Sequence, residues 1–270
     1  MTQASQLASE AVSIEIGGMA IALRTQDPPF RQLLETRYAG FTKPPANPQF
    51  EFEIDLFESR DAAPDEDLRV QRQGDQWLMR RGDFHAEWDS RIGRGHIRQS
   101  RNPYAIDSVL RIVHTLILAR QGGFLVHAAS AIRNGRAFLF AGVSGAGKTT
   151  ISRLAPRDAT LLTDEISYIR RDGDVYRACG TPFAGELARV GENQSAPLNA
   201  LFLLEQGPEN RIDPVGTSEA IRSLMRHILF FAEDQELVNL VFRSACKFVE
   251  RVPVRRLTFV PDQRVWEVIG

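Results

Sequence analysis

Residues 138–152 read FLFAGVSGAGKTTIS, an apolar run followed by a glycine-rich turn and a lysine. Positions 142–149 fit G-x-x-x-x-G-K-[ST] in full. Glycines let the backbone curl so that several N–H groups meet the oxygens of a phosphate, and a following helix presents its positive N-terminus to the same anion. The residues expected to hold the phosphates of a nucleotide are Gly142, Ser144, Gly145, Ala146, Gly147, Lys148, Thr149 and Thr150.

The strand that leads into this loop has an unusual partner. Asn134-Gly135 separates two apolar runs, and this pair favours a type I′ turn, which needs a positive φ at both positions. We therefore expect the strand before the loop to be one arm of an antiparallel hairpin. A phosphate-binding loop more often follows the first strand of a parallel βαβ unit.

An acidic pair follows soon after the loop. An apolar strand is expected over residues 159–163, and it leads directly to Asp164 and Glu165. Thr149 and these carboxylates are candidate ligands of Mg²⁺. One carboxylate of the pair can hold the metal while the other orients or deprotonates an attacking hydroxyl. The alternative is an ordinary acidic turn after a strand.

The rest of the chain divides at about residue 104. Residues 1–104 have the alternating pattern of β-strands, with a hairpin at Gly17-Gly18, a strand over 50–57 and a proline-rich connection between them. Residues 105–121 have the apolar spacing of a helix that ends at Gly122-Gly123. Further predicted elements are a strand over 200–206, helices over 217–232 (capped by Thr217 or Ser218) and 234–249 (capped by Asp234), and closing strands over 255–260 and 265–269.

Composition limits the classes of function. The 270 residues carry a net charge of −1, so no strong field favours nucleic acid or an anionic membrane. The two cysteines are far apart, the N-terminal residues do not resemble a signal peptide, and no apolar run is long enough to span a membrane. We expect a cytoplasmic protein. Lys148 is one of only three lysines in an arginine-rich chain.

Several classes of nucleotide-binding protein lack support in the sequence. A Ras-like GTPase needs an Asn-Lys-x-Asp guanine reader, and none of the three lysines provides one. The signature of an ABC ATPase is absent as well. A small-metabolite kinase usually begins with its phosphate-binding loop, whereas this loop lies in the middle of the chain.

The hairpin strand, the short helix after the loop and the early acidic pair together resemble the HPr kinase family, within the phosphoenolpyruvate-carboxykinase-like fold. The matching segments are Val126-His127, GVSGAGKT at 142–149, LLTDE at 161–165 and TPFAGE at 181–186. The resemblance covers roughly residues 105–260 and is strongest to the smaller HPr-kinase-related proteins. It implies an α/β (α+β) P-loop kinase domain with a mixed sheet over 105–270, preceded by a smaller β-rich domain of unknown role over 1–104.

The resemblance also implies residue roles. Lys148 and Thr149 would hold the phosphates and Mg²⁺, and Asp164 and Glu165 would supply the base and a metal contact; because two aspartates stand here in the family, we assign the base to Asp164. His127 would contact the phosphates or the base, with a packed histidine as the alternative. Glu186 would be an outer metal or substrate contact, with a structural turn as the alternative.

The implied activity is transfer of the γ-phosphoryl group of ATP, with Mg²⁺, to a Ser or Thr hydroxyl of a protein or peptide. Some smaller relatives are associated with ribosomally made peptide pathways, which makes a precursor-peptide serine the specific expectation. The segment associated with dephosphorylation in HPr kinase is not found here. Two alternatives stay open: a nucleotide-binding scaffold without transfer activity, and a small-molecule kinase. The family also forms homo-oligomers, a state that these residues do not determine.

Overall fold

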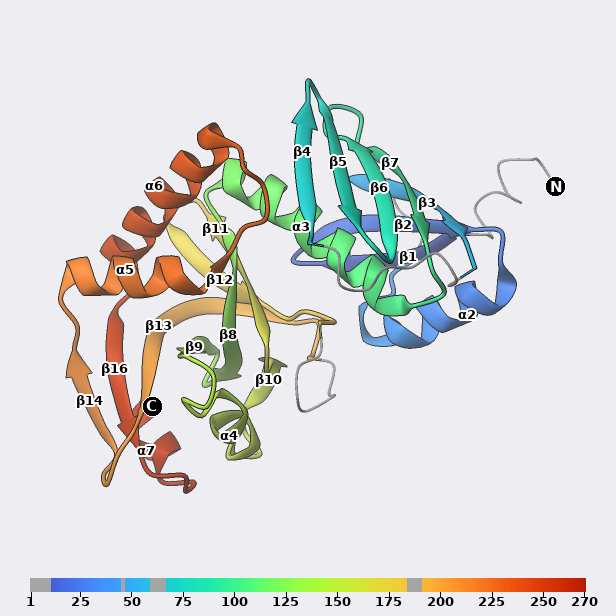
Figure 1. Cartoon of the computed structure of the whole chain (residues 1–270). Helices are drawn as coiled ribbons and strands as arrows, with labels where there is room; N and C mark the ends of the chain where they lie inside the picture. The colour runs from blue at the N-terminus through green and yellow to red at the C-terminus, as the bar shows by residue number, and fades with distance from the viewer. Residues whose placement is uncertain (1–10, 45–46, 59–66, 184–190) are drawn as a thin grey trace. The chain divides into compact units, whose positions relative to one another are not determined.

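The computed structural model describes residues 11–44, 47–58, 67–183 and 191–270. The chain forms two compact units (Figure 1). The first contains the residues up to Val113 together with Phe231–Gln235, and the second contains His114–Phe230 and Glu236–Gly270. Each unit is built on a mixed sheet with a few helices, so the α+β class expected from the sequence is confirmed.

The first unit has a sheet of seven strands in the described part of the chain. Its elements are β1 (Ala11–Ile16), β2 (Met19–Thr25), α2 (Pro28–Arg37), η1 (Ala39–Phe41), β3 (Phe50–Leu56), β4 (Arg69–Gln73), β5 (Gln76–Arg81), β6 (Phe84–Asp89), β7 (Arg94–Gln99) and the start of α3 (Pro103–Gln121). The strand order is β1-β2-β3-β7-β6-β5-β4. Strand β3 is parallel to both of its neighbours, while the other pairs are antiparallel.

The first hairpin is confirmed, because Gly17 and Gly18 have φ values of 62° and 82°. The expected proline-rich connection after β2 is wrong, since α2 begins there. Prolines lack an N–H that the first helical turn would leave unpaired anyway. Asp27 caps the helix by accepting a hydrogen bond of 2.8 Å from the amide of Phe30. The cap at Asp27 and the prolines in the first turn therefore favour a helix in a segment whose composition alone indicates a loop.

The second unit has a sheet of nine strands among the described residues. Its elements after α3 are β8 (Phe124–Arg133), β9 (Arg136–Ala141), α4 (Lys148–Arg153), β10 (Thr160–Thr163), β11 (Ile166–Asp172), β12 (Val175–Cys179), β13 (Ser195–Gln206), β14 (Arg211–Pro214), α5 (Thr217–His227), β15 (Ile228–Leu229), α6 (Gln235–Arg251), β16 (Val254–Phe259) and α7 (Val265–Ile269). The main path is β10-β8-β11-β12-β13-β16-β14, with β9 between β8 and β13, and β15 beside β8.

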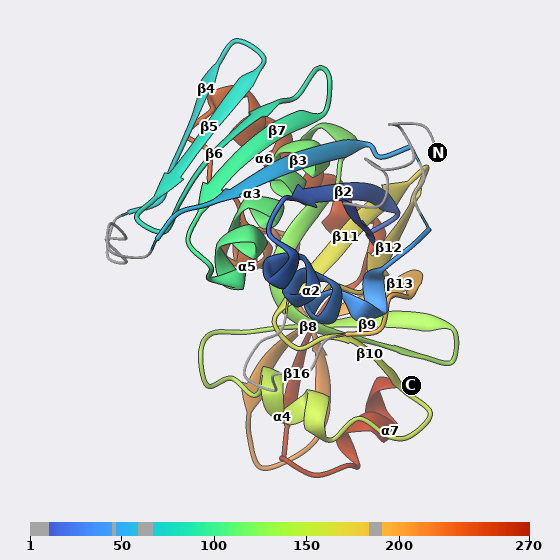
Figure 2. The same ribbon diagram turned by 90° about the vertical axis from the view of Figure 1, so that its right-hand side faces the viewer.

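Both faces of this second sheet are covered. Helices α5 and α6 pack on one face, over a core that includes Val126, Leu139 and Phe248. Helices α4 and α7 pack on the other face, over Phe140, Phe202 and other aromatic residues. Figures 1 and 2 both show these two pairs of helices on opposite sides of the sheet. Strand β9 therefore reads as a continuous apolar run, as a strand buried on both faces should.

The hairpin that leads into the loop is confirmed. Strands β8 and β9 are antiparallel, and Asn134 and Gly135 have φ values of 51° and 72°. Both positions therefore adopt the left-handed conformation that a type I′ turn requires. This short turn fixes the register between β8 and β9, and so determines which residues of β8 lie beside the loop.

Two details near the C-terminus differ from the expectation. Helix α5 has Gly216 at its N-cap with no side-chain cap, so neither Thr217 nor Ser218 has the expected role. Residues 265–269 form the helix α7 rather than a closing strand. Their alternation is short, and Trp266 instead anchors the segment by donating from its indole N–H to the carbonyl of Ile151, 3.2 Å away. No helix in the described ranges is long and apolar enough to cross a membrane.

Candidate functional site

The loop between β9 and α4 requires its glycines. Gly145 and Gly147 have φ values of 80° and 110°, a region that residues with a side chain rarely adopt. A Cβ on Gly147 would lie 2.5 Å from the ring of Phe259, and one on Gly142 would lie 2.6 Å from the Cβ of Ala146. The glycine spacing seen in the sequence is therefore demanded by backbone conformation and by close packing.

Two hydrogen bonds fix the backbone of the loop. The amide of Ala146 donates to the carbonyl of Val143 over 3.1 Å, and the side chain of Gln206 donates to the carbonyl of Gly145 over 2.7 Å. Among the described residues, the amides of Ser144, Gly145 and Gly147 have no hydrogen-bond partner. Uncommitted amides in a glycine-rich turn are the donors that bind phosphate oxygens in such loops.

Lys148 is the cation of the loop. Its residue is only 9% exposed, and its ammonium group donates one hydrogen bond of 2.9 Å to the carbonyl of Gly142. An ammonium group has three protons to donate, so this contact orients the side chain and leaves capacity for an anion. Helix α4 has six residues, so its dipole adds little, and the amides and Lys148 supply most of the positive potential.

The register of β8 brings His127 to the loop. Ala128 pairs with Ala141, the last residue before the loop, and His127 itself pairs with Ile166, the first residue of β11. Glu165 therefore comes next to His127, and the Nε2–Oε1 distance between them is 3.3 Å. On the other side of β8, Val126 pairs with Ile228, which places His227 one position from this pair.

The charges around His127 set its protonation. Burial, and then the positive charge of Lys148, lower its pKa below the ordinary value, and a further small lowering comes from His227. The carboxylate of Glu165 opposes these effects but does not outweigh them. At neutral pH the imidazole is therefore neutral. His127, Lys148 and Glu165 form one electrostatic cluster, and this part of the predicted site is together in space.

The two carboxylates after β10 have different surroundings. Asp164 is only 2% exposed, whereas the side chain of Glu165 is 34% exposed. The Thr163 hydroxyl accepts hydrogen bonds from the amides of Glu165 and Ile166, at 3.2 and 3.3 Å, which fixes the turn between β10 and β11. Asp164 is therefore buried, whereas Glu165 is partly open and lies beside His127.

The remaining predicted residues have simple positions. Thr149 and Thr150 are half-buried in the first turn of α4. Glu186 lies outside the described residues. In the part of the chain that the structure describes, no three His, Cys, Asp or Glu side chains gather closely enough to hold a metal by themselves. Thr149 with one or two carboxylates fits Mg²⁺ in its usual role beside a nucleotide, where phosphates and water supply most of the ligands.

A cavity of about 570 Å³ opens beside the start of the loop, and sequence reasoning missed most of its lining. His127, Ala141 and Gly142–Ser144 form one side, and the other residues come from β13, α5 and β16. The polar members among these are Glu205, Glu219, Ser223, Arg226, His227 and Arg256. Glu205 and Arg256 come from the parallel neighbours β13 and β16, and the other four come from α5. No local sequence signal predicts that these elements meet.

Comparison with known families places the chain. The model of the family described as SynChlorMet cassette protein ScmC matches residues 99–270. The chain belongs to the ScmC family. The ScmC match contains every residue of the candidate site, from His127 to Arg256, and leaves most of the first unit unmatched. The family name states no activity, and no curated protein matches the chain.

Among solved structures, the HPr(Ser) kinase/phosphatase from Coxiella burnetii is similar over 54% of this chain and 90% of its own. The identity is 10% and the TM-score is 0.28. A likeness at this TM-score supports no conclusion about the activity of this ScmC-family chain. The case for a function therefore rests on the site itself.

Proposed function

We propose that this protein is an ATP- and Mg²⁺-dependent kinase that phosphorylates a Ser or Thr hydroxyl of a protein or peptide. The observation that carries the proposal is the loop 142–149. Two of its glycines are left-handed, and several of its amides make no hydrogen bond. The ammonium group of Lys148, which makes one hydrogen bond within the loop, lies next to the His127–Glu165 pair. A phosphate-binding loop beside a carboxylate and a neutral imidazole contains the parts that phosphoryl transfer needs.

The residues of the loop would bind and orient the polyphosphate. The amides of Ser144, Gly145 and Gly147 would donate to phosphate oxygens, and Lys148 would neutralise charge on the β and γ phosphates. Thr149, Asp164 and Glu165 are the residues that would hold Mg²⁺. Mg²⁺ held there would neutralise the negative charge that develops on the phosphates.

The proposed reaction forms a bond between the acceptor oxygen and the γ phosphorus and breaks the bond from that phosphorus to the β–γ bridging oxygen. ADP leaves with the electron pair of the broken bond, and a carboxylate takes the proton of the acceptor hydroxyl. Exposure supports Glu165 for this last role, because it is partly open and touches His127, whereas Asp164 is buried. The sequence-based assignment to Asp164 is the competing hypothesis.

The acceptor would lie in the cavity beside the loop. Its lining combines carboxylates, Arg226 and Arg256, and two histidines. A polar segment of polypeptide suits such a mixed surface better than an apolar ligand does. A ribosomally made precursor peptide, as the resemblance to the smaller HPr-kinase-related proteins implies, is the specific acceptor that we propose.

The test incubates the full chain with γ-labelled ATP and Mg²⁺ in a lysate of its source organism. We expect label on a polypeptide, whose modified residue mass spectrometry would identify. Lys148→Ala should abolish this label. Lys43→Ala is the matched control, because it removes another lysine at an exposed position of the first unit, and it should label normally.

Other outcomes would redirect the proposal. Label only on small molecules would make the protein a metabolite kinase, and nucleotide binding without any transfer would make it a nucleotide-dependent scaffold. The base is identified by comparing Glu165→Gln with Asp164→Asn. If Glu165 takes the proton, Glu165→Gln loses transfer by about a hundred-fold or more while binding of ATP measured without Mg²⁺ is kept. Full activity in Glu165→Gln would return the role to Asp164.

A further inference from the structure

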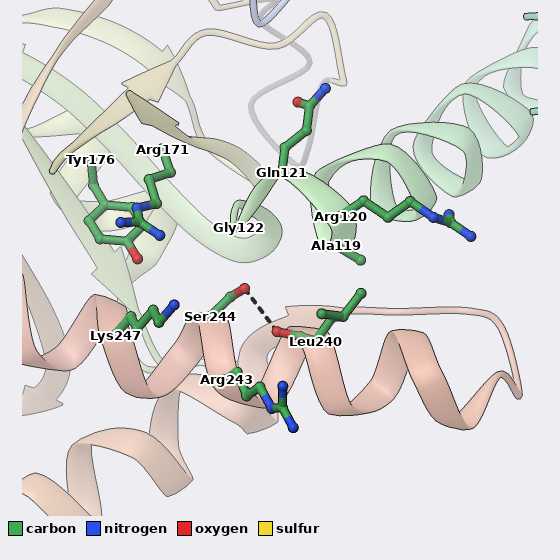
Figure 3. A pocket seen from close by; sticks show the side chains of 10 residues that line it. All are labelled: Ala119, Arg120, Gln121, Gly122, Arg171, Tyr176, Leu240, Arg243, Ser244 and Lys247. Carbon is green, nitrogen blue, oxygen red and sulfur yellow. Dashed lines mark hydrogen bonds between the residues drawn. The ribbon is translucent and has the colours of Figure 1, made fainter. Parts of the chain in front are cut away.

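A second, smaller pocket of the same unit lies away from the loop. Its volume is about 230 Å³, and it is enclosed by the end of α3, strands β11 and β12, and helix α6 (Figure 3). Arg171 packs over Gly122, where a Cβ would lie 3.2 Å from the arginine Cδ. The left-handed turn at Gly122, with a φ of 78°, therefore forms part of the wall.

The charge on this pocket has one sign. Four of its lining residues are basic and none is acidic: Arg120, Arg171, Arg243 and Lys247. Lys247 is exposed and makes no ion pair within the described ranges. The nearest carboxylate to Arg171 is that of Asp174, 3.7 Å away and largely in solvent. Because the whole chain carries a net charge of −1, this positive pocket is a local feature rather than part of a general basic surface.

The hydroxyl of Tyr176 is the second observation. The residue is 3% exposed, and its buried hydroxyl has no hydrogen-bond partner among the described residues. Burial raises the pKa of Tyr176, so the hydroxyl keeps its proton and is a donor. A buried polar group without a partner is costly, and native proteins rarely keep one without a reason. Figure 3 shows this hydroxyl on the same side of the pocket as the Arg171 guanidinium and the Lys247 ammonium.

We propose that this pocket binds a small dianion with a phosphate group, either free phosphate or a phosphate monoester. Tyr176, Lys247 and Arg171 would donate hydrogen bonds to different oxygens of one tetrahedral group. Ser244 lines the same pocket but donates to the carbonyl of Leu240, 2.9 Å away, so its oxygen is left to accept. Several positive charges around a small volume suit a dianion better than a single carboxylate, because hydrogen bonds between charged groups are the strong ones.

The experiment is calorimetric titration of the full chain with inorganic phosphate and with glycerol 3-phosphate. It uses the Lys148→Ala background, so that the loop does not contribute to the measured binding. Citrate at the same concentration tests selectivity for phosphate. We expect one saturable site for phosphate or its monoester, and the tighter of the two ligands tells the two sources apart.

The variants separate binding from folding. Lys247→Ala removes an exposed cation of the pocket and should weaken phosphate binding by about ten- to a hundred-fold. Arg69→Ala removes an exposed arginine of the first unit and should leave the affinity unchanged. Tyr176→Phe should weaken binding by about ten-fold and yet raise the thermal midpoint of the ligand-free protein, because it deletes a buried hydroxyl that has no partner.

Two results would overturn the proposal. The first is the absence of saturable binding of either phosphate ligand. The second is an affinity that Lys247→Ala and Tyr176→Phe leave unchanged, or that citrate matches. Nucleotide binding at the loop is measured in separate titrations of the Lys148-containing chain, so failure here leaves the kinase proposal standing and failure of the kinase proposal leaves this one standing.

Discussion

Polar residues have different surroundings in the two sheets of the molecule. In the first unit, strand β6 alternates buried and outward-facing residues, so its polar side chains reach solvent. In the second unit, β9 is buried along almost its whole length and β8 along most of it. A polar side chain on the first sheet needs no protein partner, whereas one inside the second sheet must find one.

The polar residues within the second sheet show this demand. Ser167 donates to the carbonyl of Ala128 and lies 2.8 Å from the hydroxyl of Ser130. His127 and Glu165 pair at the end of the same strands. Polar groups of this kind either complete the structure or serve a site. The difference between the sheets teaches that polar residues of the second sheet are held by protein partners, so their substitution should have larger effects than substitution on the outward face of the first sheet.

The largest contrast is expected from matched glycine substitutions. Gly147→Ala combines a left-handed φ with a clash against Phe259, whereas Gly74→Ala has a φ of 64° in open space. We expect losses of about 2–5 kcal/mol for Gly147→Ala and about 1–2 kcal/mol for Gly74→Ala. Urea unfolding of both variants measures the difference. Equal losses would mean that Phe259 moves freely and that the loop is not tightly packed.

The next effect concerns pH. His114 is fully buried against the edge of Tyr168, and burial lowers its pKa to about 3. The unfolded chain binds this proton near pH 6.5, so the contribution to stability is complete above that pH and is lost as the pH falls toward 3. From pH 7 to pH 5 the loss is about 2 kcal/mol. His114→Leu should flatten the measured decline in unfolding free energy by about that amount; an unchanged slope would contradict the assignment.

A smaller effect is expected where the second sheet steadies its loop. Gln206→Ala removes the hydrogen bond to the carbonyl of Gly145. A neutral hydrogen bond of this kind contributes about 1 kcal/mol, so nucleotide affinity should fall by roughly five-fold. Calorimetric titration with ATP and Mg²⁺ measures it, and Gln73→Ala, at an exposed position of the first sheet, is the control. An equal affinity in both variants would show that the hydrogen bond from Gln206 does not support nucleotide binding.

The smallest effect is expected on the outward face of the first sheet. Arg94 lies 2.8 Å from Glu51, but its side chain is 71% exposed. Surface ion pairs contribute little, so Arg94→Ala should cost less than about 0.5 kcal/mol in urea unfolding. A larger loss would show that Arg94 is buried by a partner in solution. Polar residues on the first sheet would then also depend on protein contacts.

The sequence predicted the features that depend only on neighbouring residues. Asn134-Gly135 has one favoured turn, and the glycines of the loop have conformations that other residues rarely adopt, so both could be read directly. The prolines at the start of residues 28–37 suggest a loop, but they occupy the first turn of a helix, where proline is tolerated. Asp27 caps this helix. The helix at 265–269 was misread because a short alternating run has no decisive period and Trp266 packs against α4.

The candidate site was predictable only in part for a related reason. Lys148 and the acidic pair belong to recognisable segments, and His127 came from a family resemblance. His227 and Arg256 gave no signal, because β15 and β16 reach the loop region only through their pairing with β8 and β13. The roles of all these residues stay predictions until the proposed assays are made.

The central position of β8 has a consequence for how this chain tolerates insertions and deletions. One strand pairs with β9, β10, β11 and β15, so its register sets the neighbours of His127 on both sides. A single residue inserted within β8 would turn every later side chain to the opposite face of the sheet. A residue inserted at Asn134-Gly135 would only lengthen a turn. Lineages of this family should therefore vary in length at the hairpin tip and keep the spacing from Phe124 to Arg133 constant.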